Sequence, residues 1–177
     1  MGFGLESVIR RALIAIGLLV AVAVAGVAGC SSTPATTTLA TATYTQASVT
    51  VKVSLSEQGS QSWQLKVLFV PPSPGFHLYS LGMPDGGVHG LGIPTRLSVR
   101  GALTAAGTAT ADQPTLQFDV AALGVKLPVY PDGPVTLTLP VSRVDGPTAQ
   151  VVVSYGACSS ATCLAPVIDE AIPLTVS

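Results

Sequence analysis

The chain has 177 residues, of which 48% are hydrophobic and 10% charged, and its formal net charge is -1. This length suits one ordinary domain with an N-terminal extension. A near-neutral chain lacks the basic field that DNA and RNA binding requires, so no nucleic-acid partner is expected.

The N-terminus has the pattern of an export signal. Arg10 and Arg11 precede an uninterrupted apolar run, Ala12 to Gly29, as in a secretory signal peptide. The run ends in Val-Ala-Gly-Cys, which resembles the bacterial lipobox, in which the cysteine, here Cys30, is lipidated and becomes the mature N-terminus. We therefore expect residues 1–29 to be a lipoprotein signal peptide and Cys30 to carry a membrane anchor. The alternative is an uncleaved transmembrane anchor. Either one places the protein in the bacterial cell envelope, outside the cytoplasm.

A Ser/Thr/Ala-rich stretch follows the expected lipidation site. Residues 31–46 carry no charge and no apolar periodicity, which predicts that 30–46 is a lipidated cysteine followed by a flexible tether. A stretch so poor in large apolar side chains does not offset the entropy lost on ordering. The folded domain is therefore expected to span residues 47–177.

The rest of the chain has the pattern of an all-β domain. Apolar and polar side chains alternate with the period of half-buried strands in 47–55, 63–69, 115–120 and 135–141. Trp63 lies on one of these alternations and is expected in the core. Shorter apolar runs at 76–81, 97–99, 150–155 and 172–176 bring the expected count to about eight strands. Turn signals separate the runs, and no helical period is sustained after residue 30. We predict an immunoglobulin-like antiparallel β-sandwich.

Two cysteines remain after Cys30, at Cys158 and Cys163. A close pair in an exported domain is expected to form a disulfide. Closing a loop of about six residues contributes roughly 2 kcal/mol in the chain-entropy model, less than half the value for a loop of 100. From the residues alone, a structural staple and a redox site are equally good interpretations.

Three segments carry a family resemblance. They are Tyr155-x-x-Cys158-x4-Cys163-x-x-Pro166, Gly75-Phe76-His77-Leu78-Tyr79 and Gly92-Ile93-Pro94-Thr95. In their order they resemble the N-terminal domain of the membrane thiol:disulfide interchange protein DsbD, which is an immunoglobulin-like domain with a redox cysteine pair. The resemblance covers roughly residues 49–176. The membrane and thioredoxin domains that serve this domain in the family have no counterpart in the sequence, so the electron donor is expected to be another protein.

The resemblance implies an activity of the protein-disulfide reductase type. Cys158 and Cys163 would cycle between dithiol and disulfide with thioredoxin-like partners, with Cys163 attacked and Cys158 leaving. The candidates to border the pair are Tyr79, Tyr155, Pro166 and His77, with core packing as the alternative for the tyrosines. The loop 81–91, rich in glycine and without an aromatic residue, would cover the pair and gate access by its mobility.

Other chemistries find less support. His77, Met83 and His89 lie close in sequence, but their spacing matches no metal motif, and neither a metal nor a cofactor is expected. No Lys, Arg or His flanks the cysteines, so the attacking thiolate is expected to come from the partner. The alternative function is a non-enzymatic binding lipoprotein whose disulfide is purely structural.

Overall fold

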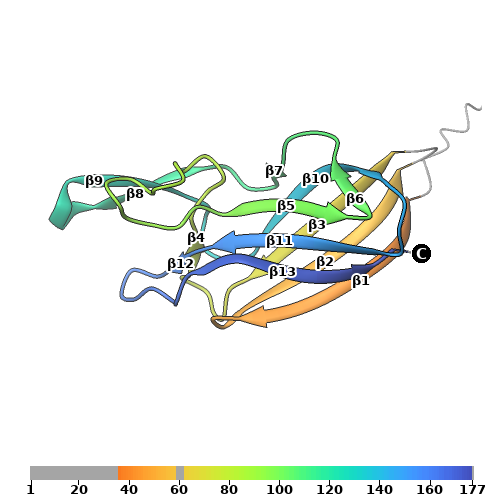
Figure 1. Ribbon diagram of the computed structural model, residues 1–177. Helices are drawn as coiled ribbons and strands as arrows, with labels where there is room; N and C mark the ends of the chain where they lie inside the picture. Colours follow the sequence, from red (N-terminus) through yellow and green to blue (C-terminus); the bar gives the residue numbers. More distant parts are fainter. Residues whose placement is uncertain (1–35, 59–61, 177) are drawn as a thin grey trace, which may run out of the picture. The chain divides into compact units, whose positions relative to one another are not determined.

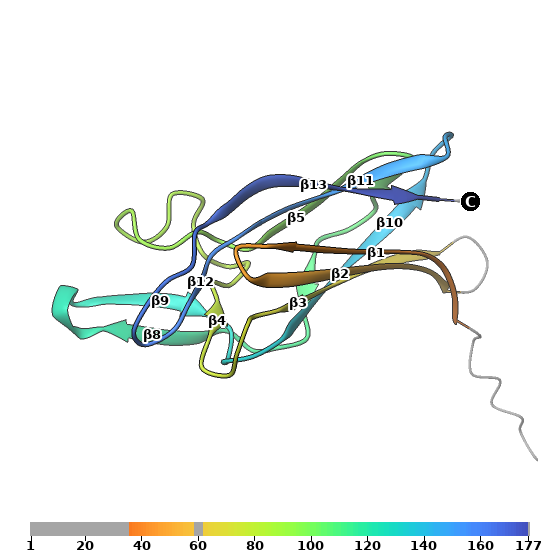
Figure 2. The ribbon, with the colours of Figure 1, turned by 90° about the horizontal axis from the view of Figure 1, so that it is seen from below.

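The structure is a computed structural model that describes residues 36–58 and 62–176. Two antiparallel sheets face each other as layers (Figure 2). The larger sheet has the order β1-β2-β3-β10-β6, with β7 also pairing with β10. Its strands are β1 (Thr36–Gln46), β2 (Val49–Gln58), β3 (Trp63–Val70), β6 (Leu103–Ala105), β7 (Thr110–Ala111) and β10 (Val135–Arg143). The smaller sheet, β13-β11-β5, contains β5 (Arg96–Gly101), β11 (Thr148–Tyr155) and β13 (Val167–Thr175). The predicted immunoglobulin-like β-sandwich is confirmed.

Two small two-stranded sheets complete the described fold. Strand β4 (His77–Leu78) pairs with β12 (Ala157–Cys158), and β8 (Leu116–Val120) forms a hairpin with β9 (Val125–Val129) across a short 3-10 turn at Ala121–Leu123. A bridge between Tyr79 and Val129 links the two small sheets. Both lie at the same end of the sandwich (Figure 1). Among the described residues, no helix has the length and apolar character needed to cross a membrane.

The core lies between the sheets and follows the predicted alternation. Every second residue of β2, β3 and β10 points inward, so that Val51, Val67 and Leu137 have no exposed surface. The Phe69 ring of the larger sheet meets the Tyr155 ring of the smaller sheet edge-on, with centroids 5.4 Å apart. Such aromatic pairs add to the hydrophobic stabilisation that burial provides.

Trp63 is less buried than the sequence predicts. It is only partly buried at the margin of the core, and the Arg143 guanidinium lies 5.2 Å from the centroid of its ring. Trp63 is the first residue of β3 and lies where the sheet meets solvent. Its ring packs partly against the core and also makes a cation-π contact with Arg143.

The prediction of a tether over 31–46 is wrong for residues 36–46, which form β1. β1 pairs with β2 from Thr36 opposite Gln58 to Gln46 opposite Val49. Ala40, Ala42 and Tyr44 pack against the core, and the threonines between them face outward. The inner face carries mostly methyl groups, too small to register as apolar periodicity, while threonine favours extended backbone. Residues 1–35, which include the expected signal peptide and Cys30, lie outside the described residues.

The turn between β1 and β2 predicts a stabilising substitution. Ala47 and Ser48 both have positive φ, 48° and 62°, as a two-residue hairpin of this hand requires. A residue with a side chain disfavours a backbone with positive φ, and the Ser48 side chain is exposed. Ser48→Gly is therefore expected to raise the free energy of unfolding by about 0.5–1 kcal/mol. Urea denaturation measures the change, and Ser142→Gly, at an exposed position inside β10, is expected to lower stability instead.

Candidate functional site

The cysteine pair closes a tight turn at the end of β12. Cys158 and Cys163 form a disulfide, and their Cα atoms lie 4.0 Å apart. Within the turn, the Ser159 amide donates to the Thr162 carbonyl at 2.7 Å, and the Ser159 hydroxyl oxygen accepts from the amides of Ala161 and Thr162. The backbone and the Ser159 hydroxyl thus hold the turn that brings the two cysteines together.

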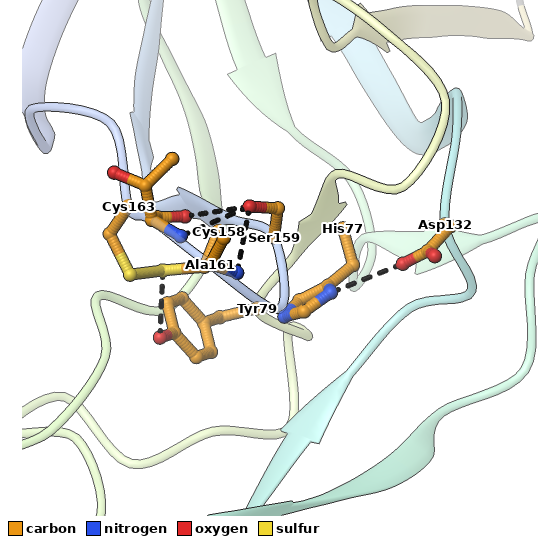
Figure 3. Close-up of a disulfide and its surroundings, with 8 residues drawn as sticks. His77, Tyr79, Asp132, Cys158, Ser159, Ala161 and Cys163 are labelled. Carbon is orange, nitrogen blue, oxygen red and sulfur yellow. Dashed lines mark hydrogen bonds and ion pairs between the residues drawn. A yellow bond between two sulfur atoms is a disulfide. The ribbon is translucent and has the colours of Figure 1, made fainter.

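The two sulfurs have unequal surroundings. Cys163 is exposed, whereas only 6% of Cys158 is accessible. The Tyr79 hydroxyl lies 3.1 Å from Cys158 Sγ (Figure 3). Burial raises the pKa of Tyr79 above its ordinary value of 10, so the phenol keeps its proton at neutral pH. A hydroxyl that remains protonated is a hydrogen-bond donor for a thiolate on Cys158.

A cavity of about 300 Å³ lies beside the disulfide. The residues that line it come from both small sheets, from the turn after β12 and from the loop after β4: His77, Tyr79, Leu91, Gly92, Phe118, Val120, Leu123, Leu127, Cys158, Ser159 and Cys163. Cys158, Tyr79 and Met83 belong to a small apolar cluster separate from the core of the sandwich. The β8–β9 hairpin therefore packs beside the disulfide and not into the main core, and its Leu116 is 48% exposed.

A buried histidine borders the same cavity. His77 Nδ1 lies 3.2 Å from Asp132 Oδ1, and the imidazole ring packs against Phe118 with centroids 4.9 Å apart. The His77 side chain is 4% exposed, while the Asp132 carboxylate is 58% exposed. The pair thus connects the surface with the interior next to Cys158.

The loop 81–91 lies where the family resemblance implies, since Leu91 lines the cavity and Met83 packs in the cluster with Cys158. Hydrogen bonds and an ion pair restrain this loop more than its glycine content predicts. The Arg96 guanidinium donates to the carbonyls of Leu81 and Met83 at 2.9 and 2.6 Å and pairs with Asp85 at 2.6 Å. The aromatic cover of the disulfide comes from Tyr79 and Phe118 instead of from this loop.

Comparison with known proteins supports the architecture. No protein-family model and no curated protein matches the chain by sequence. Among solved structures, it matches the N-terminal periplasmic domain of ScsB from Proteus mirabilis, with a TM-score of 0.53 and 16% identity. The chain shares its fold with that domain. The match covers 78% of this chain and 52% of the ScsB chain, so this chain spans about half the length of the ScsB structure. At this identity the likeness to the ScsB domain is one of fold.

The structure brings some of the predicted site residues together and leaves others apart. Tyr79 and His77 lie beside the disulfide. Tyr155 belongs to the core of the sandwich, where its hydroxyl donates to the Gln46 carbonyl at 3.1 Å, so it does not border the pair. Burial, with smaller contributions from Tyr44 and Glu170, raises the pKa of Tyr155 to about 12. Pro166 is exposed and does not line the cavity. Among residues 36–58 and 62–176, no His, Cys, Asp and Glu side chains form a metal-binding group.

Three contributors were missed from the sequence. Phe118 lies in the alternation at 115–120, which predicts only a strand, and Asp132 and Arg96 belong to no pattern that predicts a site. Asp132 lies 55 residues from His77, and no local pattern links them. A basic residue at the start of a strand and an acidic residue in the preceding loop were the available signals for the Arg96–Asp85 pair.

Tyr79→Phe tests the hydroxyl that faces Cys158. The substitution removes the donor to the leaving sulfur while it keeps the ring. Because hydrogen bonds to charged groups contribute about 1.5–3 kcal/mol, we expect reduction by a dithiol to slow by roughly 10-fold. The rate of reduction is measured by quenching samples with an alkylating agent at successive times and quantifying the two redox forms by mass spectrometry. Tyr155→Phe is the matched control, since it removes a buried hydroxyl remote from the disulfide, and an equal slowing in both variants would contradict this role for Tyr79.

Arg96→Lys tests what restrains the loop. An ammonium group cannot reproduce the planar fork that bonds Leu81, Met83 and Asp85 together. We expect stability to fall by about 1–2 kcal/mol and amide hydrogen exchange in residues 81–85 to accelerate. Arg100→Lys, at an exposed position of the same strand, serves as the control. Unchanged exchange in the loop would show that other contacts hold it.

Proposed function

We propose that the protein is an extracytoplasmic, lipid-anchored thiol-disulfide exchange protein that passes electrons to or from thioredoxin-like partners through Cys158 and Cys163. The observation that carries the proposal is the unequal exposure of the pair, with Cys163 open to solvent and Cys158 buried against a hydroxyl. A thiolate attacks a disulfide along the axis of the bond, so one accessible sulfur and one supported leaving sulfur suit exchange.

The roles follow from this asymmetry. A partner thiolate attacks Cys163, the bond to Cys158 breaks, and the electron pair moves to the Cys158 sulfur beside Tyr79. A mixed disulfide through Cys163 forms first, and the partner's second thiol then resolves it. In this scheme the protein supplies the electrophile, and its partner supplies the activated thiolate.

The structural interpretation of the disulfide is weaker on energetic grounds. Cys158 and Cys163 lie only five residues apart in sequence, so cross-linking them removes less entropy from the unfolded chain than a bridge between distant segments would. A staple placed for stability would join distant segments. The bond instead lies at the end of the sandwich, beside a cavity and outside the main core.

The reduction potential of the pair tests the proposal. The protein is equilibrated with glutathione and with thioredoxin, and the two redox forms are counted by alkylation and mass spectrometry. An exchange site is expected to have a potential above about -300 mV, whereas structural disulfides lie below it. A bridge that stays fully oxidised at -300 mV would favour the binding lipoprotein with a structural disulfide.

The location of the protein is part of the proposal. The apolar run before Cys30 and the lipobox-like sequence support export and lipid anchoring, and the structural neighbour is a periplasmic domain. Mass spectrometry of the membrane-extracted protein should find an acylated Cys30 at the N-terminus and residues 1–29 removed. An intact Met1 in the mature protein would rule out this processing.

A further inference from the structure

The Nε2 atom of His77 has no role in the hydrogen bonding described so far. The imidazole is buried, and Nδ1 lies 3.2 Å from the Asp132 carboxylate. Within the part of the chain that the structure describes, Nε2 is buried and has no hydrogen-bond partner. Leaving a buried polar atom unpaired costs about 1–3 kcal/mol, so an unpaired nitrogen next to a reactive bond points to a use for it.

The backbone places the His77 side chain in the same cavity as the leaving sulfur. His77 and Cys158 are directly paired across β4 and β12, so their side chains project from the same face of this strand pair. Tyr79, two residues after His77, projects on that face as well. All three line the same cavity, and Figure 3 shows Asp132 on the side of the imidazole away from the disulfide.

Exchange creates a need for a proton at this position. When the disulfide opens, the Cys158 sulfur receives an electron pair. Only 6% of this residue is exposed to solvent. A thiolate is poorly solvated in apolar surroundings, and burial therefore favours the neutral thiol. Tyr79 stabilises the sulfur by a hydrogen bond but retains its own proton, because burial raises the pKa of the phenol. The proton has to come from another group.

We propose that His77, held by Asp132, transfers a proton between Nε2 and the sulfur of Cys158 during exchange. The inference rests on the proposed function. In reduction, a thiolate of the dithiol partner attacks Cys163 Sγ, the S–S bond breaks, and its electron pair passes to Cys158 Sγ. Because no hydrogen bond joins Nε2 and Sγ, the proton passes from Nε2 of the imidazolium to Sγ through a water molecule that enters the cavity. Neutral imidazole remains, and bulk solvent restores its proton. In oxidation the same proton moves from Cys158 to Nε2.

Asp132 has a positioning role in this step. A carboxylate accepts hydrogen bonds, so the proton of the pair lies on Nδ1, and Nε2 is left as the exchanging atom. The contact with the carboxylate also fixes the orientation of the ring, as in other carboxylate-oriented histidines. The titratable groups around the imidazole are Asp132 from the loop before β10, Tyr79 from its own segment and Cys158 from β12, while the β8–β9 hairpin contributes the uncharged ring of Phe118.

The test measures reduction of the full-length protein by dithiothreitol from pH 5 to 9, with each rate constant expressed per dithiothreitol thiolate. His77→Asn keeps an amide donor near Asp132 and removes Nε2. Asp132→Asn keeps the shape of an exposed side chain and removes its charge. We expect both variants to be reduced about 10- to 100-fold more slowly at neutral pH and to lose the pH dependence that a histidine contributes between pH 5 and 8. His89→Asn, at an exposed histidine in the neighbouring loop, should behave like the wild type.

The outcomes separate the relay from the proposed function. If the wild type is reduced and both variants keep its rate constant and pH dependence, the relay is wrong and the exchange function stands. A slower His77→Asn variant with the wild-type pH dependence indicates a packing role and also overturns the relay. Should His77→Asn fail to fold, Asp132→Asn decides alone, since its side chain is on the surface. A wild-type disulfide that resists reduction refutes the proposed function instead.

Discussion

A Cys158→Ser variant is expected to accumulate as a mixed disulfide through Cys163 when it is mixed with oxidised glutathione, which has no second thiol to reverse the bond. The remaining thiol is exposed, and the resolving sulfur that would release the partner is gone. In Cys163→Ser the remaining thiol is 6% exposed and lies against Tyr79. Access and thiolate character together govern thiol reactivity, so we expect conjugation of Cys163 to be at least about 10-fold faster than conjugation of Cys158.

The two cysteine variants control for each other. Both lose the same bond, whose contribution to stability is about 2 kcal/mol for a loop of this length, so a difference between them reflects the position of the thiol. Non-reducing gels and intact-mass measurements over time give the two rates. Equal rates, or no conjugate from either variant, would contradict the assignment of Cys163 as the attacked sulfur.

The second large effect concerns β1. If residues 36–46 pair with β2 as the structure describes, a double substitution Ala40→Asp and Ala42→Asp places two carboxylates against the core. Burying an unpaired charge is strongly unfavourable, and we expect the free energy of unfolding to fall by about 2–4 kcal/mol. This is a large share of the 5–15 kcal/mol that holds a typical domain together.

The same strand supplies the control for this experiment. Thr41→Asp and Thr43→Asp introduce the same charges on the exposed face of β1. That pair should change stability by less than about 1 kcal/mol. Urea denaturation of both double variants measures the difference. Equal small effects in the two variants would mean that residues 36–46 behave as the tether expected from composition.

The long strands were predictable from sequence because their inward side chains are large and regularly spaced. Val49 to Leu55 in β2 and Val135 to Val141 in β10 show the clearest alternation, and both form strands of the main core. β1 was missed because alanine and threonine give little contrast between its two faces. The short strands β6, β7 and β12 carry too few residues for any period, and their pairing depends on neighbours distant in sequence.

The site was predictable only in part. The spacing of the cysteines and the family resemblance identified the disulfide, and the resemblance also identified Tyr79 and His77. The partner of His77 could not be found, because Asp132 lies 55 residues away in the connection between β9 and β10, and only the tertiary fold brings the two together. Tyr155 was misplaced for the converse reason. It lies three residues before Cys158, but β11 turns its ring toward Phe69 and into the core.

The lining of the cavity beside the disulfide also bears on how fast a partner finds the protein. Among the described residues, those that line it include no Lys, Arg, Asp or Glu. Long-range attraction between charged surfaces accelerates encounters and weakens as ionic strength rises. With none of these side chains in the lining, we expect the association rate to change little between low and physiological salt, and selection among partners would then depend on how well their shapes match the cavity.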